Sequence, residues 1–411
     1  MSAGAKSSGP LKPPVIRLTK KGLRRLRSGH PWIFQSDIAD VPDSTVGGDL
    51  VKVAGPDGRA LAVAAYSATS LITLRCIPLT LKEDFEAGWM RLIDAAIQRR
   101  GGGRQGQRLV NGDADGLPGL IVDQYDDAIS IQALSQAADR RLDPLVEHLK
   151  ASLGPTLLVA RNDPRVRTLE GLPQEKKILY SAEGRAESTR SLVQLGEVKM
   201  EIDLFEGQKT GAFLDQVGNW VRAGEIAQHM LAEQGEGATL KALDCCCYNG
   251  GFSLHLAQAG AEVTAIDASA VALERVRANA ETNGLSDRVT PLEANVFDQL
   301  RAYEAEGTTF DLIVLDPPAF AKRKSALKSG QRAYKEINLR ALKLLRPGGR
   351  LITCSCSAQM TRPRFEEMLR EAAADARRWV RILERRGAGP DHPTLITAPE
   401  TDYLKVLVAE A

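Results

Sequence analysis

The fold is decided by the stretch Leu243-Asp244-Cys245-Cys246-Cys247-Tyr248-Asn249-Gly250-Gly251. It has the pattern of a buried strand that runs into a glycine turn, after which a helix opens at Phe252. Glycines in such a turn let the backbone approach a ligand closely at a helix N-terminus. Their spacing differs from Gly-x-Gly-x-x-Gly, which argues against a dinucleotide. The stretch therefore predicts the first strand, turn and helix of an α/β sheet that binds another kind of ligand.

Outward from this turn, strands and helices alternate from about residue 205 onward. This alternation predicts a parallel sheet with helices on both faces, and such sheets bind ligands at the carboxyl ends of their strands. A final pair of segments predicts an antiparallel hairpin at the sheet edge. The expected strands are 240–246, 262–266, 288–292, 311–315 and 349–353, the expected helices are 251–259, 269–282, 331–345 and 363–376, and the hairpin is 380–383 with 403–408.

The residues before 205 follow other patterns. Residues 1–14 are rich in Ser, Gly, Pro and Lys, and we expect them to be a disordered tail. Short strand-like runs separated by Gly and Pro turns predict a small β-barrel over 15–80. Over 81–204 we expect a small α/β unit with a hairpin around Asp126-Asp127. The expected barrel strands are 15–18, 50–53, 61–66 and 72–75, and the expected elements of the α/β unit are helices 82–100 and 136–152 and strands near 156–161, 177–181 and 196–204.

The charge of the whole chain, which is +2 over 411 residues, does not by itself indicate nucleic acid. Basic residues cluster locally, however, in two parts of the chain. One is the stretch before Asp37 and the other is residues 322–335, and neither contains an acidic residue. Two such patches predict a surface for a polyanion, although a plain solvated surface explains them equally well. The candidate RNA-binding residues are Lys20, Lys21, Arg24, Arg25, Lys322, Arg323 and Lys324.

Other bulk features concern the compartment. The six cysteines lack the spacing of a disulfide scaffold, so we expect a reduced cytoplasm. No stretch approaches the ~20 apolar residues of a membrane span, so we expect no membrane partner. The adjacent thiols of Cys245, Cys246 and Cys247 point in different directions and predict packing at a strand end, with no metal site.

Acidic residues end two of the expected strands. Asp267 follows Asp244 at about the spacing at which a carboxylate reaches ribose hydroxyls. The fourth strand ends in Asp316-Pro317-Pro318, where rigid prolines hold a carboxylate and backbone carbonyls toward a pocket. A glycine loop, an acidic strand end and Asp-Pro-Pro together indicate S-adenosylmethionine in preference to NAD.

Cys356 indicates the chemistry. It follows the fifth strand in Thr353-Cys354-Ser355-Cys356-Ser357, and strand alternation would put both thiols on one side. Carbon 5 of cytosine is a poor nucleophile until a thiolate adds at carbon 6, and Asp316 could bond N3 and N4 of the ring. Cys356 is the predicted nucleophile and Cys354 a packing residue. Buried inert thiols are common, and Asp316 could instead cap the next helix; both alternatives stay open.

These motifs belong to a longer match. The chain resembles the ribosomal RNA large subunit methyltransferase I family, which methylates carbon 5 of a cytosine in 23S rRNA. The chain departs from the family pattern at Cys245–Gly251, Ala319, Val217 and Asn295. The matching segments span nearly the whole chain: Trp32-Ile33-Phe34, 111–120, Arg161-Asn162-Asp163, 169–172, 207–216, 316–320, Ser355-Cys356-Ser357, Asp391-His392-Pro393 and Pro399-Glu400-Thr401.

The resemblance implies an N-terminal PUA domain over 15–80, a central β-β-α-β-β domain over 81–204 and a C-terminal Rossmann-like class I methyltransferase domain over 205–411. It implies an S-adenosylmethionine-dependent RNA cytosine-C5 methyltransferase that works through a transient bond between Cys356 and carbon 6, with Asp316 orienting the base. Asp267 should hold the ribose and Asn295 the adenine. The expected cofactor-binding residues are Phe213, Asp215, Asp244, Tyr248, Gly250, Asp267, Asn295, Val296 and Asp316.

Two other functions stay open on the sequence. A relative of this domain methylates guanine at N7, where the ring nitrogen is already nucleophilic and no cysteine is needed. A non-catalytic RNA-binding assembly factor would keep the fold and lose the chemistry. The oligomeric state is open as well, with a homodimer among the alternatives.

Overall fold

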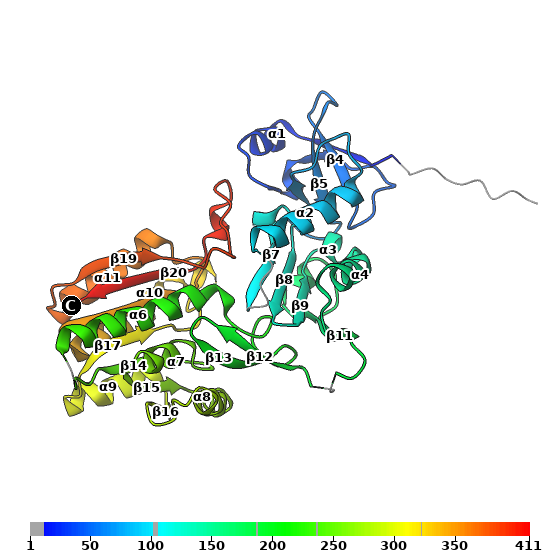
Figure 1. Ribbon diagram of the computed structural model, residues 1–411. Helices are drawn as coiled ribbons and strands as arrows, with labels where there is room; N and C mark the ends of the chain where they lie inside the picture. Colours follow the sequence, from blue (N-terminus) through cyan, green and yellow to red (C-terminus); the bar gives the residue numbers. More distant parts are fainter. Residues whose placement is uncertain (1–11, 102–105, 186–187, 236, 322) are drawn as a thin grey trace, which may run out of the picture. The chain divides into compact units, whose positions relative to one another are not determined.

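The computed structural model describes residues 12–101, 106–185, 188–235, 237–321 and 323–411 (Figure 1). Most of the tail expected over 1–14 and the candidate residue Lys322 lie outside the described residues. The chain forms two compact units. The first contains the described residues up to Thr189 together with Leu204–Gly211 and Thr394–Thr401, and the second contains Arg190–Asp203, Ala212–Pro393 and Asp402–Ala411. Among the described residues, no helix combines the length and the apolar character needed to cross a bilayer.

The first unit begins with a six-stranded sheet in the order β2-β6-β5-β4-β1-β3. Its four predicted strands are present with small shifts at their ends. The sequence did not predict the helix α1 (Lys20–Arg27), which begins after Thr19, whose hydroxyl oxygen accepts a hydrogen bond from the backbone N–H of Gly22 at 3.0 Å. The strands are β1 (Val15–Leu18), β2 (Trp32–Ile33), β3 (Ile38–Asp40), β4 (Leu50–Ala54), β5 (Ala60–Tyr66) and β6 (Leu74–Ile77), and a 3-10 turn spans Gln35–Asp37.

The rest of this unit is built on a five-stranded sheet in the order β11-β10-β9-β8-β7. The hairpin predicted around Asp126-Asp127 is confirmed, since β8 and β9 pair antiparallel on either side of it. The helix expected over 136–152 is two helices separated at Arg141. The elements are α2 (Phe85–Arg99), β7 (Gln107–Asn111), β8 (Leu120–Tyr125), β9 (Ala128–Ala133), α3 (Gln136–Arg140), α4 (Leu142–Leu153), β10 (Leu157–Asn162), α5 (Val166–Leu169) and β11 (Glu175–Ser181), with a 3-10 turn over Gly112–Asp115.

A two-stranded hairpin, β12 (Arg190–Leu195) with β13 (Val198–Asp203), follows this sheet and belongs to the second unit. The next segment, Leu204–Gly211, returns to the first unit. This hairpin, which the sequence placed in the domain over 81–204, is thus part of the other unit, and the chain passes between the two units at 189–190, 203–204 and 211–212.

The second unit contains a seven-stranded sheet in the order β16-β15-β14-β17-β18-β20-β19. All pairs among β14–β18 are parallel, and β20 is antiparallel to both β18 and β19, as the sequence predicts for the final hairpin. β20 lies between β18 and β19, so that β19 forms one edge of the sheet and β16 forms the other. The strands are β14 (Lys241–Cys245), β15 (Glu262–Asp267), β16 (Val289–Glu293), β17 (Phe310–Leu315), β18 (Leu345–Ser355), β19 (Arg381–Arg386) and β20 (Lys405–Glu410).

Six α-helices of the described residues accompany this sheet. The predicted helices are present, whereas the sequence did not predict α6 and α9. In α9 only Val296 and Leu300 are buried, which leaves a weak apolar pattern. The helices are α6 (Val217–Gln234), α7 (Gly251–Gln258), α8 (Ala270–Thr282), α9 (Val296–Glu306), α10 (Leu327–Leu344) and α11 (Arg362–Ala376), with 3-10 turns over Leu214–Gln216, Lys324–Ala326 and Pro399–Thr401.

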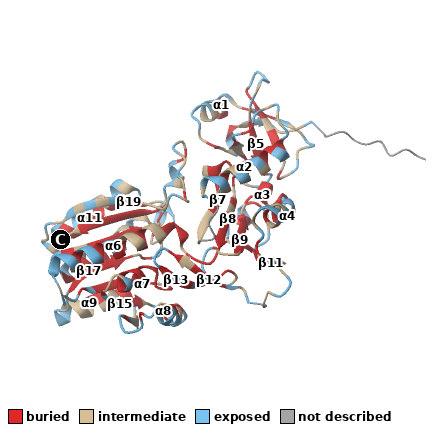
Figure 2. Ribbon diagram, in the orientation of Figure 1, coloured by how far each residue is buried: buried red, intermediate tan, exposed pale blue. Residues whose placement is uncertain are grey.

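The strand order fixes where a ligand can bind. From β14 the chain moves outward to β15 and β16, then crosses back to β17 on the other side of β14. With right-handed crossovers, α7 and α8 cover one face and α9, α10 and α11 cover the other, and the strands between them are buried (Figure 2). The carboxyl ends of β14, β15 and β17 thus meet at the point where the winding direction reverses, which is where open α/β sheets bind ligands.

Candidate active site

The turn after β14 has a strained backbone. Cys246, Tyr248 and Gly250 have φ angles of 64°, 50° and 90°, a region that residues other than glycine rarely adopt. The backbone N–H of Tyr248 donates to Oδ2 of Asp267 at 2.9 Å, which holds the turn against the end of β15. A Cβ added to Gly251 would lie 2.3 Å from Cε2 of Trp220, so α7 can begin this close to α6 only with glycine there. Strain held in this way is typical of a functional site.

Two carboxylates hold this turn and the start of the helix after it through hydrogen bonds. Asp244 is fully buried, and its Oδ2 accepts hydrogen bonds from the backbone N–H and the hydroxyl of Ser253 at 3.0 and 2.6 Å. Burial raises the pKa of Asp244 to about 7. Asp267 is half-buried, and its two oxygens accept the backbone N–H groups of Tyr248 and Ser269, both at 2.9 Å. Each carboxylate oxygen has two lone pairs, so Asp267 keeps the capacity to accept hydroxyl groups.

An apolar hollow adjoins the turn between the ends of β14 and β17 and the start of α9. Val296 and Phe297 line it from α9, and the ring of Phe297 lies 5.9 Å from that of Phe320, another lining residue. Asn295 is exposed, and its side-chain oxygen caps α9 by accepting the N–H of Phe297 at 2.9 Å. The remaining lining residues are Cys245, Cys246, Leu315, Pro317 and Ile337. The walls of the hollow have the apolar character that is typical of small-molecule sites.

Phe213 and Asp215 precede α6 and lie near the same turn. The rings of Phe213 and Tyr248 pack edge to face with their centroids 5.3 Å apart. Asp215 is buried, and its Oδ2 accepts the hydroxyl of Tyr403 at 2.6 Å. The segment Phe213–Gln216 is therefore joined both to the glycine turn and to the segment before β20.

Asp316 directly follows β17, and its Oδ2 accepts a hydrogen bond from Nε2 of Gln216 at 2.9 Å. Gln216 is buried and its Oε1 accepts from Nδ2 of Asn219 at 2.7 Å, so its amide is fixed. The segment 207–216 is part of the family resemblance, but the sequence did not identify Gln216 as the partner of Asp316. The helix-cap alternative for Asp316 is wrong, because the next α-helix begins only at Leu327.

The two thiols at the end of β18 differ in exposure. The register pairs Leu315 with Thr353, which brings Asp316 beside Cys354. Cys354 is 0% exposed, and burial, with the charge of Asp316 next to it, raises its pKa well above the usual value for cysteine. β18 ends at Ser355, so strand alternation does not extend to Cys356, which is half-buried. Of these two thiols, only Cys356 is partly exposed to solvent.

The residue after Cys356 fixes this segment. The buried hydroxyl of Ser357 accepts the backbone N–H of Ala321 at 3.1 Å and lies 3.0 Å from the hydroxyl of Tyr334. Ala321 belongs to the stretch after Asp-Pro-Pro, and Tyr334 belongs to α10. The strand ends that carry Asp316 and Cys356 are therefore held together by hydrogen bonds.

The candidate RNA-binding residues differ in how far their charge is compensated. On α1, Nζ of Lys21 and Nε of Arg25 contact the carboxylate of the buried Asp37 at 3.1 and 2.9 Å. Lys20 and Arg24 are exposed and form no ion pair with any described residue. In the second unit Arg323 is exposed, while Lys322 and the side chain of Lys324 lie outside the described residues.

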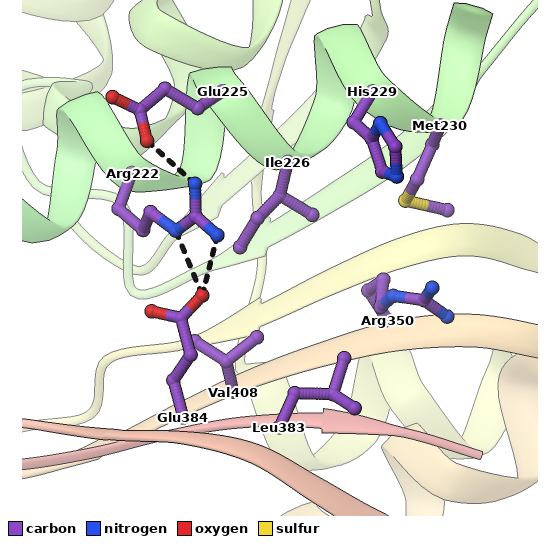
Figure 3. A pocket seen from close by; sticks show the side chains of 9 residues that line it. All are labelled: Arg222, Glu225, Ile226, His229, Met230, Arg350, Leu383, Glu384 and Val408. Atoms are coloured by element: carbon purple, nitrogen blue, oxygen red, sulfur yellow. Dashed lines mark hydrogen bonds and ion pairs between the residues drawn. The ribbon is translucent and has the colours of Figure 1, made fainter. Parts of the chain in front are cut away.

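A larger hollow, of about 430 Å³, lies between α6 and the strands β18, β19 and β20 (Figure 3). Arg222 crosses it, with Nε 2.8 Å from Oε1 of Glu384 and one terminal nitrogen 2.7 Å from Oε2 of Glu225. Arg350, at its wall, lies in the middle of β18 and pairs with Leu312 of β17, several residues before the carboxyl ends of both strands. This hollow is thus away from the strand ends that carry Asp267, Asp316 and Cys356, and we do not assign it to the reaction.

Known proteins share this arrangement. A model of PUA-like domains matches residues 16–77, and a model of S-adenosylmethionine-dependent methyltransferases matches residues 178–407. The chain is 37% identical over 402 residues to the ribosomal RNA large subunit methyltransferase I of Shewanella amazonensis, which covers 96% of this chain and 98% of the relative. The protein of the same name from Aeromonas hydrophila is 37% identical over 405 residues, with 96% and 99% covered.

A solved structure classed as a methyltransferase, in complex with SAH, aligns with a TM-score of 0.79 at 19% identity and covers 97% of this chain and 100% of that one, which supports the fold. The methyltransferase model makes S-adenosylmethionine the cofactor, and a strained glycine turn followed by an acidic strand end at Asp267 is chemically suited to a nucleoside ligand. A chain with this sheet, this turn and relatives of this identity over its whole length belongs to the ribosomal RNA large subunit methyltransferase I family.

Proposed function

We propose that this protein methylates carbon 5 of a cytosine in 23S ribosomal RNA. The name of its relatives supports ribosomal RNA of the large subunit as the substrate, and the PUA-like domain supports RNA binding. The observation that carries the choice of carbon 5 is the contrast between the two thiols after Thr353. Cys354, beside Asp316, is sealed in the core, whereas Cys356 is half-buried just beyond the end of β18.

The chain's own residues have the following roles in this proposal. The target base leaves its stack to reach the pocket, as base-modifying enzymes require. The thiolate of Cys356 forms a bond to carbon 6 while N3 of the ring holds a proton, and the carboxylate of Asp316, oriented by Gln216, accepts hydrogen bonds from that N3–H and from the exocyclic N4 amino group. S-adenosylmethionine supplies the methyl group that carbon 5 receives. Loss of the proton from carbon 5 then re-forms the double bond between carbons 5 and 6. The bond between sulfur and carbon 6 breaks, and Cys356 leaves as the thiolate.

Around the cofactor we assign Asp267 to the ribose, Val296 and the exposed Asn295 to the adenine, and the turn of Tyr248 and Gly250 to the methionine part. Phe213 and Asp215 complete this part of the site. Asp244 accepts two hydrogen bonds from Ser253 and supports the turn from within the core. Its proposed part in cofactor binding is therefore to hold the backbone of the turn.

The experiment that tests this function measures methyl transfer to 23S rRNA transcripts, followed by mass spectrometry of the nucleosides. The unsubstituted protein should yield 5-methylcytidine, and Cys356→Ala should lower turnover by at least about 10³-fold, because nucleophilic activation of carbon 5 is lost. Cys354→Ala is the matched control, since it removes a thiol two residues away that faces the core. It should retain turnover within about a factor of three once folded protein is counted.

The same assay separates the alternatives. 7-Methylguanosine as the product, with Cys356→Ala fully active, would establish the N7-guanine enzyme and sink the C5 proposal. Absence of S-adenosylmethionine binding in calorimetry would favour the assembly factor. RNA that carries 5-fluorocytosine at the target position has no proton to lose at carbon 5, so it should remain covalently attached to the unsubstituted protein and not to Cys356→Ala.

A further inference from the structure

Lys405 is a buried lysine at the candidate active site that the proposed reaction has not used. It begins β20, opposite Ser355 in the antiparallel register with β18, and only 2% of its surface is exposed. Lysine is almost never fully buried in proteins unless its charge is compensated. Lys405 lies opposite Ser355, the residue directly before Cys356. Its burial at this position therefore needs an explanation.

The ammonium group contacts the backbone that carries the thiol. Nζ donates to the carbonyl oxygen of Ser357 at 2.9 Å and to that of Tyr403 at 2.6 Å. Ser357 is the residue directly after Cys356, so the positive charge is anchored on the same segment as the sulfur. An ammonium has three hydrogens and these two bonds use two of them.

The electrostatic surroundings of Lys405 contain two acidic groups and one basic group. Burial lowers the pKa of Lys405 to about 8, Asp402 and the thiol of Cys356 act in the opposite direction, and Arg362 adds to the lowering. Asp402 is half exposed and lies 3.7 Å from Arg362, so part of its charge is already compensated. Among the described residues no carboxylate forms an ion pair with Lys405, and the half-buried thiol of Cys356 is, after Asp402, the other acidic group that acts on it.

We propose that Lys405 is a positioning residue that stabilises the thiolate of Cys356. Charges interact strongly in the weakly polarisable interior, and a neighbouring lysine favours the thiolate of a reactive cysteine. The attraction is mutual. The thiolate of Cys356 favours the ammonium form of Lys405, and that ammonium in turn favours the thiolate. The inference deepens the proposed function, on which its catalytic meaning rests.

A purely mechanical role makes a different prediction. If Lys405 only anchors the end of β18 through its two carbonyl partners, its loss would loosen the segment and slow the reaction equally at every pH. If it stabilises the thiolate, its loss moves the pH at which the thiol becomes reactive. The pH profile of the thiol, rather than turnover, therefore decides between the two roles.

The experiment follows the alkylation of Cys356 by iodoacetamide from pH 5 to pH 10, with the modified peptide identified by tandem mass spectrometry. Lys405→Met should raise the pH of half-maximal reactivity by about one unit, so that alkylation at pH 7 slows about tenfold. Tyr334→Phe is the matched control, because it removes the hydroxyl that lies 3.0 Å from Oγ of Ser357 and changes no charge near neutral pH. An unchanged midpoint in folded Lys405→Met would overturn the proposal.

A second measurement does not require Lys405 to be replaced. Lysine labelled with ¹³C at Cε reports its own protonation, and the Lys405 signal is assigned by its absence from Lys405→Gln. Cys356→Ala should lower the midpoint of that signal, because the ammonium loses its anionic neighbour, and an unshifted midpoint would count against the coupling.

Neither measurement needs RNA or a methyl donor. Failure of Cys356→Ala to stop methylation would sink the proposed C5 reaction and leave the lysine–thiol coupling to be judged by its own result.

Discussion

At the scale of single residues, the site places its carboxylates in very different surroundings. Asp244 is fully buried and its Oδ1 has no hydrogen-bond partner in the described structure, while Asp267 and Asp316 reach the strand ends. Burial disfavours the charged form, and the two hydrogen bonds from Ser253 only partly oppose this. The carboxyl of Asp244 is therefore protonated through much of the acidic range in the folded protein.

This residue predicts a dependence of stability on pH. Between about pH 4 and pH 7 the folded state keeps the proton of Asp244 and the unfolded state releases it, so its contribution to stability is complete below pH 4 and falls as pH rises to 7. The loss amounts to roughly 4 kcal/mol for a shift of about three units. Asp244→Asn should flatten this dependence. The free energy of unfolding in urea is measured at pH 5 and pH 8 by hydrogen exchange of the β14 amides. An equal change with pH in the unsubstituted protein and in Asp244→Asn would contradict the assignment.

The sequence predicted residues unevenly at this scale. Cys356 and Asp316 could be identified because each directly follows an apolar strand at the ligand-binding edge of the sheet. Gln216 and Lys405 could not, because each acts through a partner far away in sequence. Gln216 reaches Asp316 a hundred positions on, and Lys405 reaches Ser357 across a strand pair.

At the scale of elements, α1 shows how a charged helix can have two roles. Lys21 and Arg25 face the buried Asp37 and hold the helix to the sheet, whereas Lys20, Arg24 and Arg27 are exposed and form no ion pair with any described residue. The second set therefore presents uncompensated positive charge. Such charge binds phosphates through the release of counterions, which makes the affinity depend on salt.

We expect the triple substitution of Lys20, Arg24 and Arg27 by Gln to weaken RNA binding about tenfold at physiological salt. The slope of log affinity against log salt should become shallower by about 2, since each phosphate contact contributes about 0.7 to 0.9. Filter binding at several salt concentrations measures both. The matched control replaces Arg364, Arg370 and Arg377, which are equally exposed on α11 and its C-cap. Equal losses for the two triple variants would mean that α1 is not a specific contact.

The strands were easier to predict than the helices for a physical reason. A buried parallel strand is a continuous apolar run, such as Phe310–Leu315, in which every residue is buried. α9 buries only two side chains, and α1 is only eight residues long, so neither has the long stripe of apolar residues by which a helix is readily predicted from sequence. Their formation depends on caps and on packing that the local sequence does not reveal.

At the scale of the whole molecule, the N-terminal sheet contributes to two apolar clusters, one of its own that includes Ile16 and Leu74 and one that it shares with the segment after it. Leu50, Val63 and Ile77 from its strands belong to the same apolar cluster as Trp89 and Leu109 of the following segment. The PUA-like residues 16–77 therefore share part of their core with the five-stranded sheet within the first unit.

A fragment of residues 12–80 should accordingly be unstable, because its share of this cluster becomes exposed. At roughly 2 kcal/mol for each large apolar side chain, the loss from three of them is comparable to the stability of a small domain. Heteronuclear NMR should show poorly dispersed amide signals for this fragment. A fragment of residues 12–189, which retains both sheets, should give dispersed signals. Cooperative unfolding of the short fragment with unchanged dispersion would refute the shared core.

The sequence by itself determined the parallel sheet, the glycine turn and the reactive groups at the strand ends, because these depend on short apolar runs and on residues adjacent to them. Only the tertiary structure decided which thiol is accessible, which amide holds Asp316, and that a lysine is buried beside Cys356. Burial and pairing are properties of residues distant in sequence, and the interior changes the energy of a charge far more than any neighbour along the chain does.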